Sequence, residues 1–138
     1  FYDSDHKKRF YLLWSGSKEN TLSRLPNYAA TVFLLSADEK LWEKTRRQIS
    51  DTGIYFNQVR LGSVTLEQYI LFHAAKDAYH GTKHIRLSEL TDRELVPDEI
   101  LRLIVNAFVI ERYGMDIVEQ KMCEEILEER NYTVLAQS

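Results

Sequence analysis

Three ionisable side chains near the middle of the chain have the spacing best suited to chemistry. His73, Asp77 and His80 are four and three residues apart, so a helix would place all three over one face. Imidazole and carboxylate groups that converge in this way can bind a divalent metal ion or transfer protons. At a rise of about 1.5 Å per residue, however, the two histidines would lie about 10 Å apart along the helix axis. A metal site would therefore pair Asp77 with only one of them and take further ligands from elsewhere, such as His84 or Glu111, which is expected to point inward.

A structural role for these residues is the favoured interpretation. His73 and Asp77 are expected to form a hydrogen-bonded pair at the end of an apolar stripe, where each satisfies the other. The sequence contains no H-E-x-x-H pattern, P-loop, G-x-S-x-G elbow or G-x-G-x-x-G fingerprint. It therefore predicts no catalytic residue, no bound metal and no cofactor, with a metal-dependent enzyme that uses the His73, Asp77 and His80 face as the alternative.

The C-terminal segment is acidic and carries the only cysteine of the chain, Cys123. One cysteine excludes an intrachain disulfide and a cysteine-based zinc knuckle, and its carboxylate neighbours disfavour the thiolate needed for nucleophilic catalysis. The neighbouring acidic residues are Glu119, Glu124, Glu125, Glu128 and Glu129. These glutamates are expected to form either a solvated face or a surface that docks on a basic partner.

Two basic clusters lie in the first half of the chain. Their members are Lys7, Lys8 and Arg9 in the first cluster and Lys44, Arg46 and Arg47 in the second. Together they could contact phosphates, but the sequence has no helix-turn-helix glycine turn and no aromatic platform motif. Its formal net charge of -3 also lacks the excess of positive charge typical of nucleic-acid binding. Solvated helix faces are the favoured interpretation, and nucleic-acid binding is disfavoured.

Length and composition predict one ordered domain. The chain has 138 residues, of which 44% are hydrophobic, enough to build a single core over residues 1–138. No stretch reaches the roughly 18 apolar residues that span a bilayer, and no signal-peptide pattern is present. A location in the cytoplasm, away from membranes, is therefore expected.

Helical periodicity and capping signals dominate the chain. Helices are expected over residues 3–15, 26–35, 36–53, 65–80, 97–113 and 115–130. Ser36 with Glu39, and Thr65 with Gln68, have the spacing of capping boxes. Residues 54–61 are rich in β-forming side chains and are expected to be extended or a packed connection, and residues 82–96 a loop with one short turn.

The helix after Pro97 is apolar almost all round and is expected to lie at the centre of the fold. Its expected core residues are Ile100, Leu101, Leu103, Ile104, Phe108 and Ile110. The sequence as a whole predicts an all-α protein: a compact irregular or orthogonal bundle of about six helices, with one short extended segment near residues 54–61.

A resemblance to known protein families lies in three segments: residues 5–10 (DHKKRF), 28–35 (YAATVFLL) and 63–81. They resemble small proteins from Firmicute genomes, phages and integrative elements, in families known as domains of unknown function. The similarity covers about the first two thirds of the chain. It implies a cytosolic accessory protein of bacterial or phage origin and carries over no catalytic residues.

The expected function is that of a non-enzymatic protein-interaction module. Small size, missing catalytic motifs and the acidic C-terminal segment favour an accessory or inhibitory protein of a phage or mobile element, including an anti-defence role, with another protein as partner. The metal-dependent enzyme and a nucleic-acid-associated regulator that uses the basic clusters remain the alternatives.

Overall fold

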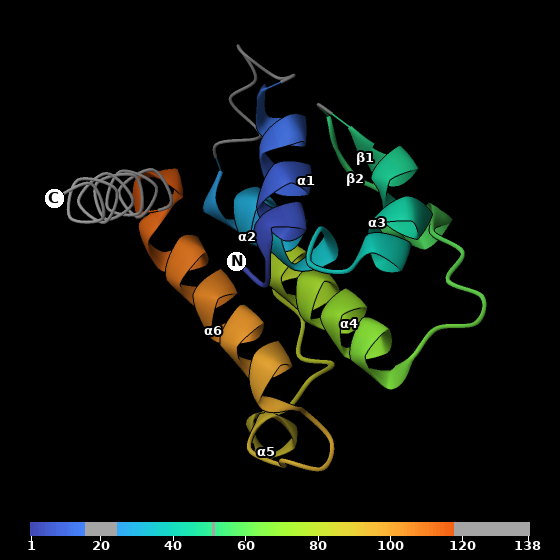
Figure 1. Cartoon of the computed structure of the whole chain (residues 1–138), viewed down its shortest axis with the longest axis vertical. Helices are drawn as coiled ribbons and strands as arrows, with labels where there is room; N and C mark the ends of the chain where they lie inside the picture. The colour runs from blue at the N-terminus through green and yellow to red at the C-terminus, as the bar shows by residue number, and fades with distance from the viewer. Residues whose placement is uncertain (16–24, 51, 118–138) are drawn as a thin grey trace, which may run out of the picture.

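The computed structural model describes residues 1–15, 25–50 and 52–117, and within them helices pack directly on one another (Figure 1). The helices are α1 (Ser4–Ser15), α2 (Pro26–Leu35), α3 (Glu39–Thr45), α4 (Leu66–His80), α5 (Leu87–Leu90) and α6 (Asp98–Tyr113), with 3-10 turns η2 (Arg46–Gln48) and η3 (Phe56–Gln58). The described residues contain one sheet, an antiparallel pair of β1 (Ile49–Ser50) and β2 (Gly53–Ile54). The predicted all-α bundle is confirmed.

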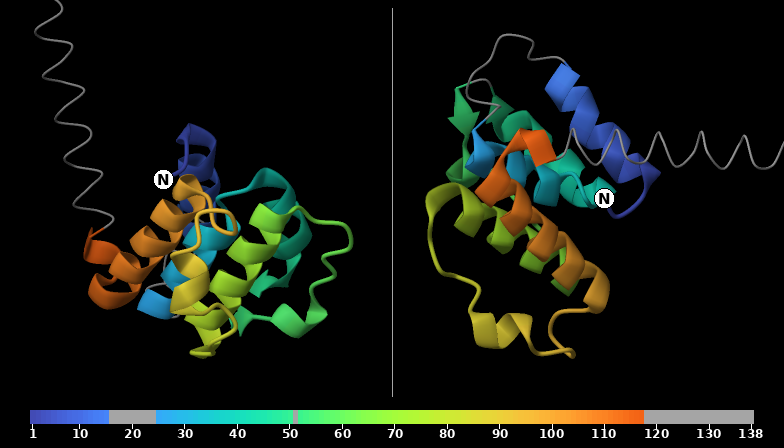
Figure 2. Two further views of the ribbon diagram at one scale, coloured as in Figure 1. Left: turned by 90° about the horizontal axis from the view of Figure 1, so that it is seen from below. Right: turned by 90° about the vertical axis from the view of Figure 1, so that its left-hand side faces the viewer.

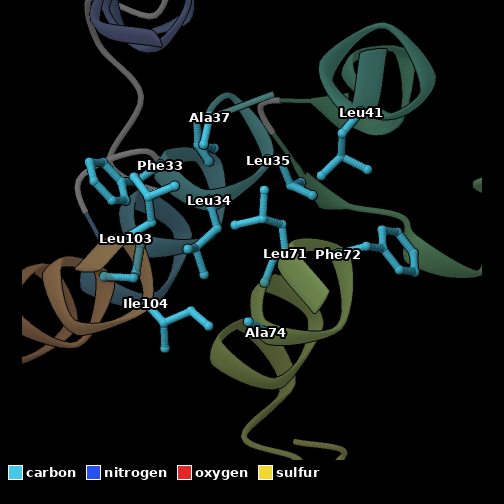
Figure 3. Packing of buried hydrophobic residues seen from close by; sticks show 14 of the residues in the cluster. Phe33, Leu34, Leu35, Ala37, Leu41, Leu71, Phe72, Ala74, Leu103 and Ile104 are labelled. Carbon is cyan, nitrogen blue, oxygen red and sulfur yellow. The ribbon is translucent and has the colours of Figure 1, made fainter. Parts of the chain in front are cut away.

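Helix α2 occupies the centre of this arrangement. It contains no charged residue, and its last eight residues are all buried. It packs chiefly against α4 and α6, which lie on either side of it (Figure 2). Figure 3 shows Leu34 among side chains of α4 and α6, and Leu35 near Leu41 of α3. A helix with no polar face can be stable in water only when other elements cover it, so α2 organises the core.

The prediction that the helix after Pro97 is the centre was wrong. Helix α6 buries one stripe, formed by Ile100, Leu103, Ile104, Ala107 and Ile110. Leu101 is only partly buried, and Phe108 is 50% exposed on the outer face. Isolated apolar side chains at a protein surface are common, so the near-continuous apolar run overstated how much of α6 is covered.

Helix α1 is fixed to the C-terminal turn of α2 by two polar side chains. His6 is fully buried; its Nε2–H donates to the Phe33 carbonyl at 2.7 Å, and its Nδ1 accepts from the Tyr2 backbone N–H at 2.9 Å. The Arg9 guanidinium donates from Nε to the Ser36 carbonyl at 2.7 Å. The last carbonyls of a helix lack partners within it, so α1 supplies donors that α2 needs.

Around His6 the environment is aromatic and dry. Its ring lies 4.7 Å from the ring of Phe33 and 5.1 Å from that of Phe1. Desolvation by burial lowers the pKa of His6 to about 4, although the hydrogen bond to the Phe33 carbonyl acts in the opposite direction. The imidazole is therefore neutral at physiological pH, with its proton on Nε2.

The chain after α2 differs from the prediction in two respects. Asp38, not Ser36, is the N-cap of α3, and it accepts from the Leu41 backbone N–H at 2.9 Å. The Ser36 hydroxyl is already used, because it donates to the Val32 carbonyl at 2.6 Å. Helix α3 also ends well before Gly53, and Ile49 lies in β1, not in the helix.

The boundaries of α4, α5 and α6 follow the sequence signals closely. Thr65 and Gln68 form the predicted capping box. Gly81 ends α4 with a φ of 71°, a left-handed conformation that glycine adopts without steric cost. Residues 82–96 contain one short helical turn, α5, and Pro97 precedes α6. Within the described residues, none of the helices has the length and apolar character needed to cross a membrane.

Replacing Ile104 with Asp should abolish folding, whereas Val105→Asp on the same helix should be tolerated. Ile104 is 2% exposed and Val105 is 46% exposed, and an unpaired buried carboxylate costs several kcal/mol out of a total stability of about 5–15 kcal/mol. Thermal melts followed by circular dichroism check both variants. Equal melts for the two would contradict the burial pattern of α6.

The free energy of unfolding should fall by about 2 kcal/mol between about pH 7.5 and about pH 5 because of His6. The pKa of His6 is about 4 in the folded chain against an ordinary 6.5. The unfolded state therefore binds more protons in this window, and stability present above the ordinary pKa is lost as the pH falls.

Urea unfolding at both pH values measures this loss. The control is His6→Gln, which cannot be protonated and should show a smaller loss over the same interval. An identical pH dependence in wild type and His6→Gln would show that His6 is not the group responsible.

Candidate functional site

The C-terminal turn of α4 carries a carboxylate that accepts three hydrogen bonds. Because Gly81 turns the chain back, the following loop folds onto Asp77. Oδ1 accepts from the Thr82 hydroxyl at 2.6 Å and from Nδ1–H of His84 at 2.7 Å, and Oδ2 accepts from the Ile85 backbone N–H at 2.9 Å. Desolvation by burial raises the pKa of Asp77, but these hydrogen bonds outweigh it and hold the pKa below its ordinary value.

His73 and His84 line one small cavity beside α4. Their ring centroids are 5.7 Å apart, and the ring of His73 lies 4.2 Å from that of Tyr69. The cavity has a volume of about 200 Å³. Its walls are formed by Leu66, Tyr69, Ile70, His73, His84, Ile85, Glu89, Leu95 and Val96. Nδ1 of His73 is buried without a hydrogen-bond partner, so one of the two imidazoles beside this cavity has an unsatisfied nitrogen.

The expected pairing of His73 with Asp77 is not formed. Asp77 bonds instead to His84, which the sequence offered only as an additional metal ligand. His80 has other neighbours, since its ring lies 5.0 Å from that of Tyr79 and 5.6 Å from that of Phe56. Helical spacing correctly puts these side chains on α4, but the loop after Gly81 decides which partners they meet.

Glu111 does not point inward as expected. It is exposed at the edge of a separate cavity of about 280 Å³ that Asp77 also lines. Desolvation raises the pKa of Glu111 above its ordinary value. Within the described parts of the chain, no group of three or more histidine, cysteine, aspartate or glutamate residues is arranged to hold a metal ion.

A larger cleft of about 740 Å³ lies between α1 and the segment formed by α3 and η2. It brings the two basic clusters of the sequence together. Its lining residues are Asp5, Lys8, Arg9, Leu12, Glu39, Trp42, Glu43, Arg46 and Arg47. We call this the α1–α3 cleft.

Several of the predicted basic-patch residues have structural partners. Arg9 donates to the carbonyls at the end of α2, and Arg46 lies 3.7 Å from the carboxylate of Glu43. Lys44 does not line the cleft; its ammonium donates to the carbonyls of Leu61 and Ser63, which holds the segment before α4. The basic clusters therefore do not form one uninterrupted positive surface.

Sequence reasoning missed the α1–α3 cleft, although a signal for it exists. Its α1 wall consists of Asp5, Lys8, Arg9 and Leu12, and its opposite wall of Glu39, Trp42 and Glu43 from α3 with Arg46 at the start of η2. Both sets follow the i, i+3, i+4, i+7 spacing of one helix face. What the sequence could not show is that the two faces meet.

The remaining candidate residues lie outside the described residues. These are Cys123 and the acidic group Glu119, Glu124, Glu125, Glu128 and Glu129. The docking role expected for the glutamates stays a prediction.

Comparisons with known proteins returned nothing to which this chain can be assigned. No protein-family model matches the sequence, and no match was found among curated proteins or among solved structures.

Removing the Asp77 carboxylate should destabilise the fold locally. Asp77→Ala leaves the Thr82, His84 and Ile85 donors without their acceptor, and we expect the free energy of unfolding to fall by about 1–3 kcal/mol. Lys83→Ala, an exposed substitution in the same loop, should change it by no more than about 0.5 kcal/mol. Urea titration of both variants provides the comparison, and equal effects would show that the loop does not depend on Asp77.

Proposed function

We propose that this protein is a non-enzymatic interaction module that binds an amphipathic helical segment of a partner protein in the α1–α3 cleft. The observation that carries this proposal is the pair of facing helical walls, each with four residues at i, i+3, i+4, i+7 spacing. An amphipathic helix binds by laying its apolar face against the apolar part of a groove, which here is formed by Leu12 and Trp42. A volume of about 740 Å³ falls in the usual range of ligand sites.

Apolar contacts in the cleft supply an anchor for such a helix. Trp42 lies in the α3 wall and is 8% exposed, so its ring is held in place by the core. Leu12 in the α1 wall is 74% exposed and has most of its surface available for burial. Tryptophan, tyrosine and arginine side chains in well-packed settings contribute most of the binding energy at protein interfaces, so Trp42 is the expected anchor and Leu12 adds apolar area beside it.

The charges of the cleft favour a protein over a nucleic acid. Three carboxylates, those of Asp5, Glu39 and Glu43, lie on the same two walls as the basic residues. A phosphate backbone would be repelled by these carboxylates, whereas a helix with charges of both signs could pair with each wall. The nucleic-acid alternative therefore has less support than the protein partner.

An accessory or inhibitory role follows naturally from this mode of binding. A small module that covers a helical segment of a host protein can block that segment without any chemistry of its own. The sequence resemblance implies an accessory protein of bacterial or phage origin, and we propose an accessory role for this chain on that basis.

The first test places a photo-crosslinking residue at position 12 and, as a control, at position 87. Leu12 lines the α1–α3 cleft and Leu87 is 79% exposed elsewhere. After irradiation in host lysate, we expect a protein adduct from position 12 that is missing from position 87. The crosslinked segment is then synthesised as a peptide for direct titration.

Titration uses the fluorescence of Trp42 in a Trp14→Phe background, which leaves one tryptophan in the chain. Binding of the peptide should shift this fluorescence. In the double variant Lys8→Glu, Arg47→Glu, the affinity for the peptide should change by roughly tenfold or more. Arg102→Glu, an equal charge change on the exposed face of α6, should leave the affinity unchanged. Adducts of equal yield from positions 12 and 87, or displacement of the peptide by mixed DNA at physiological salt, would contradict the proposal.

A further inference from the structure

We propose that His73 and His84 form a two-histidine site for a divalent transition-metal ion such as Zn²⁺, independent of the α1–α3 cleft. His73 comes from the middle of α4, and His84 comes from the loop that follows it. Both imidazoles line the same cavity of about 200 Å³. Imidazole nitrogen is the side-chain donor that zinc, nickel and copper ions share.

The separation of the two rings is close to that of histidines on a common ion. With Zn–N bonds of about 2.0–2.1 Å in tetrahedral geometry, two ligating imidazoles have centroids about 5 Å apart. The centroids of His73 and His84 are 5.7 Å apart. The His84 side chain is 49% exposed, so a small rotation of its ring meets no packed neighbour on its solvent side.

Asp77 already orients one of these ligands. Its carboxylate accepts from Nδ1–H of His84 at 2.7 Å, which leaves Nε2 as the nitrogen that carries a lone pair. Metal-bound histidines characteristically donate their other ring N–H to a carboxylate in this manner, which fixes the tautomer. The loop geometry thus prepares His84 to ligate through Nε2 before any ion is present.

His73 contributes the second donor from a packed position. Its ring is held against Tyr69 at 4.2 Å and Phe72 at 5.4 Å. Its Nδ1 is buried with no hydrogen-bond partner, although buried polar atoms are ordinarily satisfied. No group of three or more histidine, cysteine, aspartate or glutamate residues in the described parts of the chain is arranged to hold a metal ion, so water molecules complete the coordination beside the two imidazoles, and the site belongs to the class of weak, exchangeable sites.

The test titrates tag-free protein with ZnCl₂ by calorimetry and by ¹H–¹⁵N spectra of the histidine rings. We expect one ion per chain, with shifts at the rings of His73 and His84 and with His84 retaining its proton on Nδ1. His73→Ala and His84→Ala should each abolish the one-to-one binding isotherm. His80→Ala is the matched control, because His80 lies on the same helix but packs against Phe56, and it should bind as wild type does.

A more conservative variant separates ligation from folding. Asp77→Asn should weaken Zn²⁺ binding about tenfold or more, and circular dichroism establishes that each variant remains folded. Unchanged binding in His84→Ala, or loss of binding in His80→Ala, would overturn the proposal. Because none of these variants lies in the α1–α3 cleft, their outcome is independent of the proposed interaction function.

Discussion

The structure depends on burying a helix that has no polar side. Helix α2 places its apolar side chains in every direction, so it contributes to the core on all sides, while the carbonyl groups at its C-terminal end need donors from beyond the helix. Two side chains of α1 resolve this conflict: neutral His6 donates to the Phe33 carbonyl, and Arg9 donates to that of Ser36. A cation near a helix C-terminus also interacts favourably with the helix dipole. The central helix is thus completed by a neighbour.

This requirement also determines where the α1–α3 cleft lies. Because Arg9 is tied to the end of α2, the second turn of α1 is held beside the start of α3. The α1–α3 cleft is the space left between these two helices. The residues of the first basic cluster therefore have different roles. Arg9 fixes α1 to the end of α2, whereas Lys8 lines the cleft beside Leu12. One face of α1 thus both contacts the end of α2 and lines the cleft.

Much of the fold was predictable because its signals are local. The Thr65 capping box, the glycine after α4 and the proline before α6 act within one helical turn, and each marks a boundary that the structure confirms. Predictions failed where two segments compete for one group. Ser36 has the spacing of an N-cap, but its hydroxyl belongs to the end of α2, so Asp38 caps α3 instead.

The candidate sites were predictable only in part, for a related reason. Spacing identified His73 and Asp77 as neighbours on α4, but it could not show that His84 returns to take the Asp77 carboxylate. Predicting the α1–α3 cleft would require knowing that two helices meet although all of α2 separates them in the sequence. Burial also cannot be read from apolarity alone, as the half-exposed Phe108 shows.

The left-handed turn at Gly81 makes the α4 site self-contained. His73, Asp77 and His84 fall within twelve consecutive positions of the chain, and the groups that orient them come from the same helix end and loop. Closing such a short loop costs little chain entropy, so the arrangement does not wait for distant parts of the protein to assemble. The hydrogen bonds to Asp77 therefore need only the end of α4, Gly81 and the four residues that follow it, so this turn can form early, before the rest of the fold is assembled.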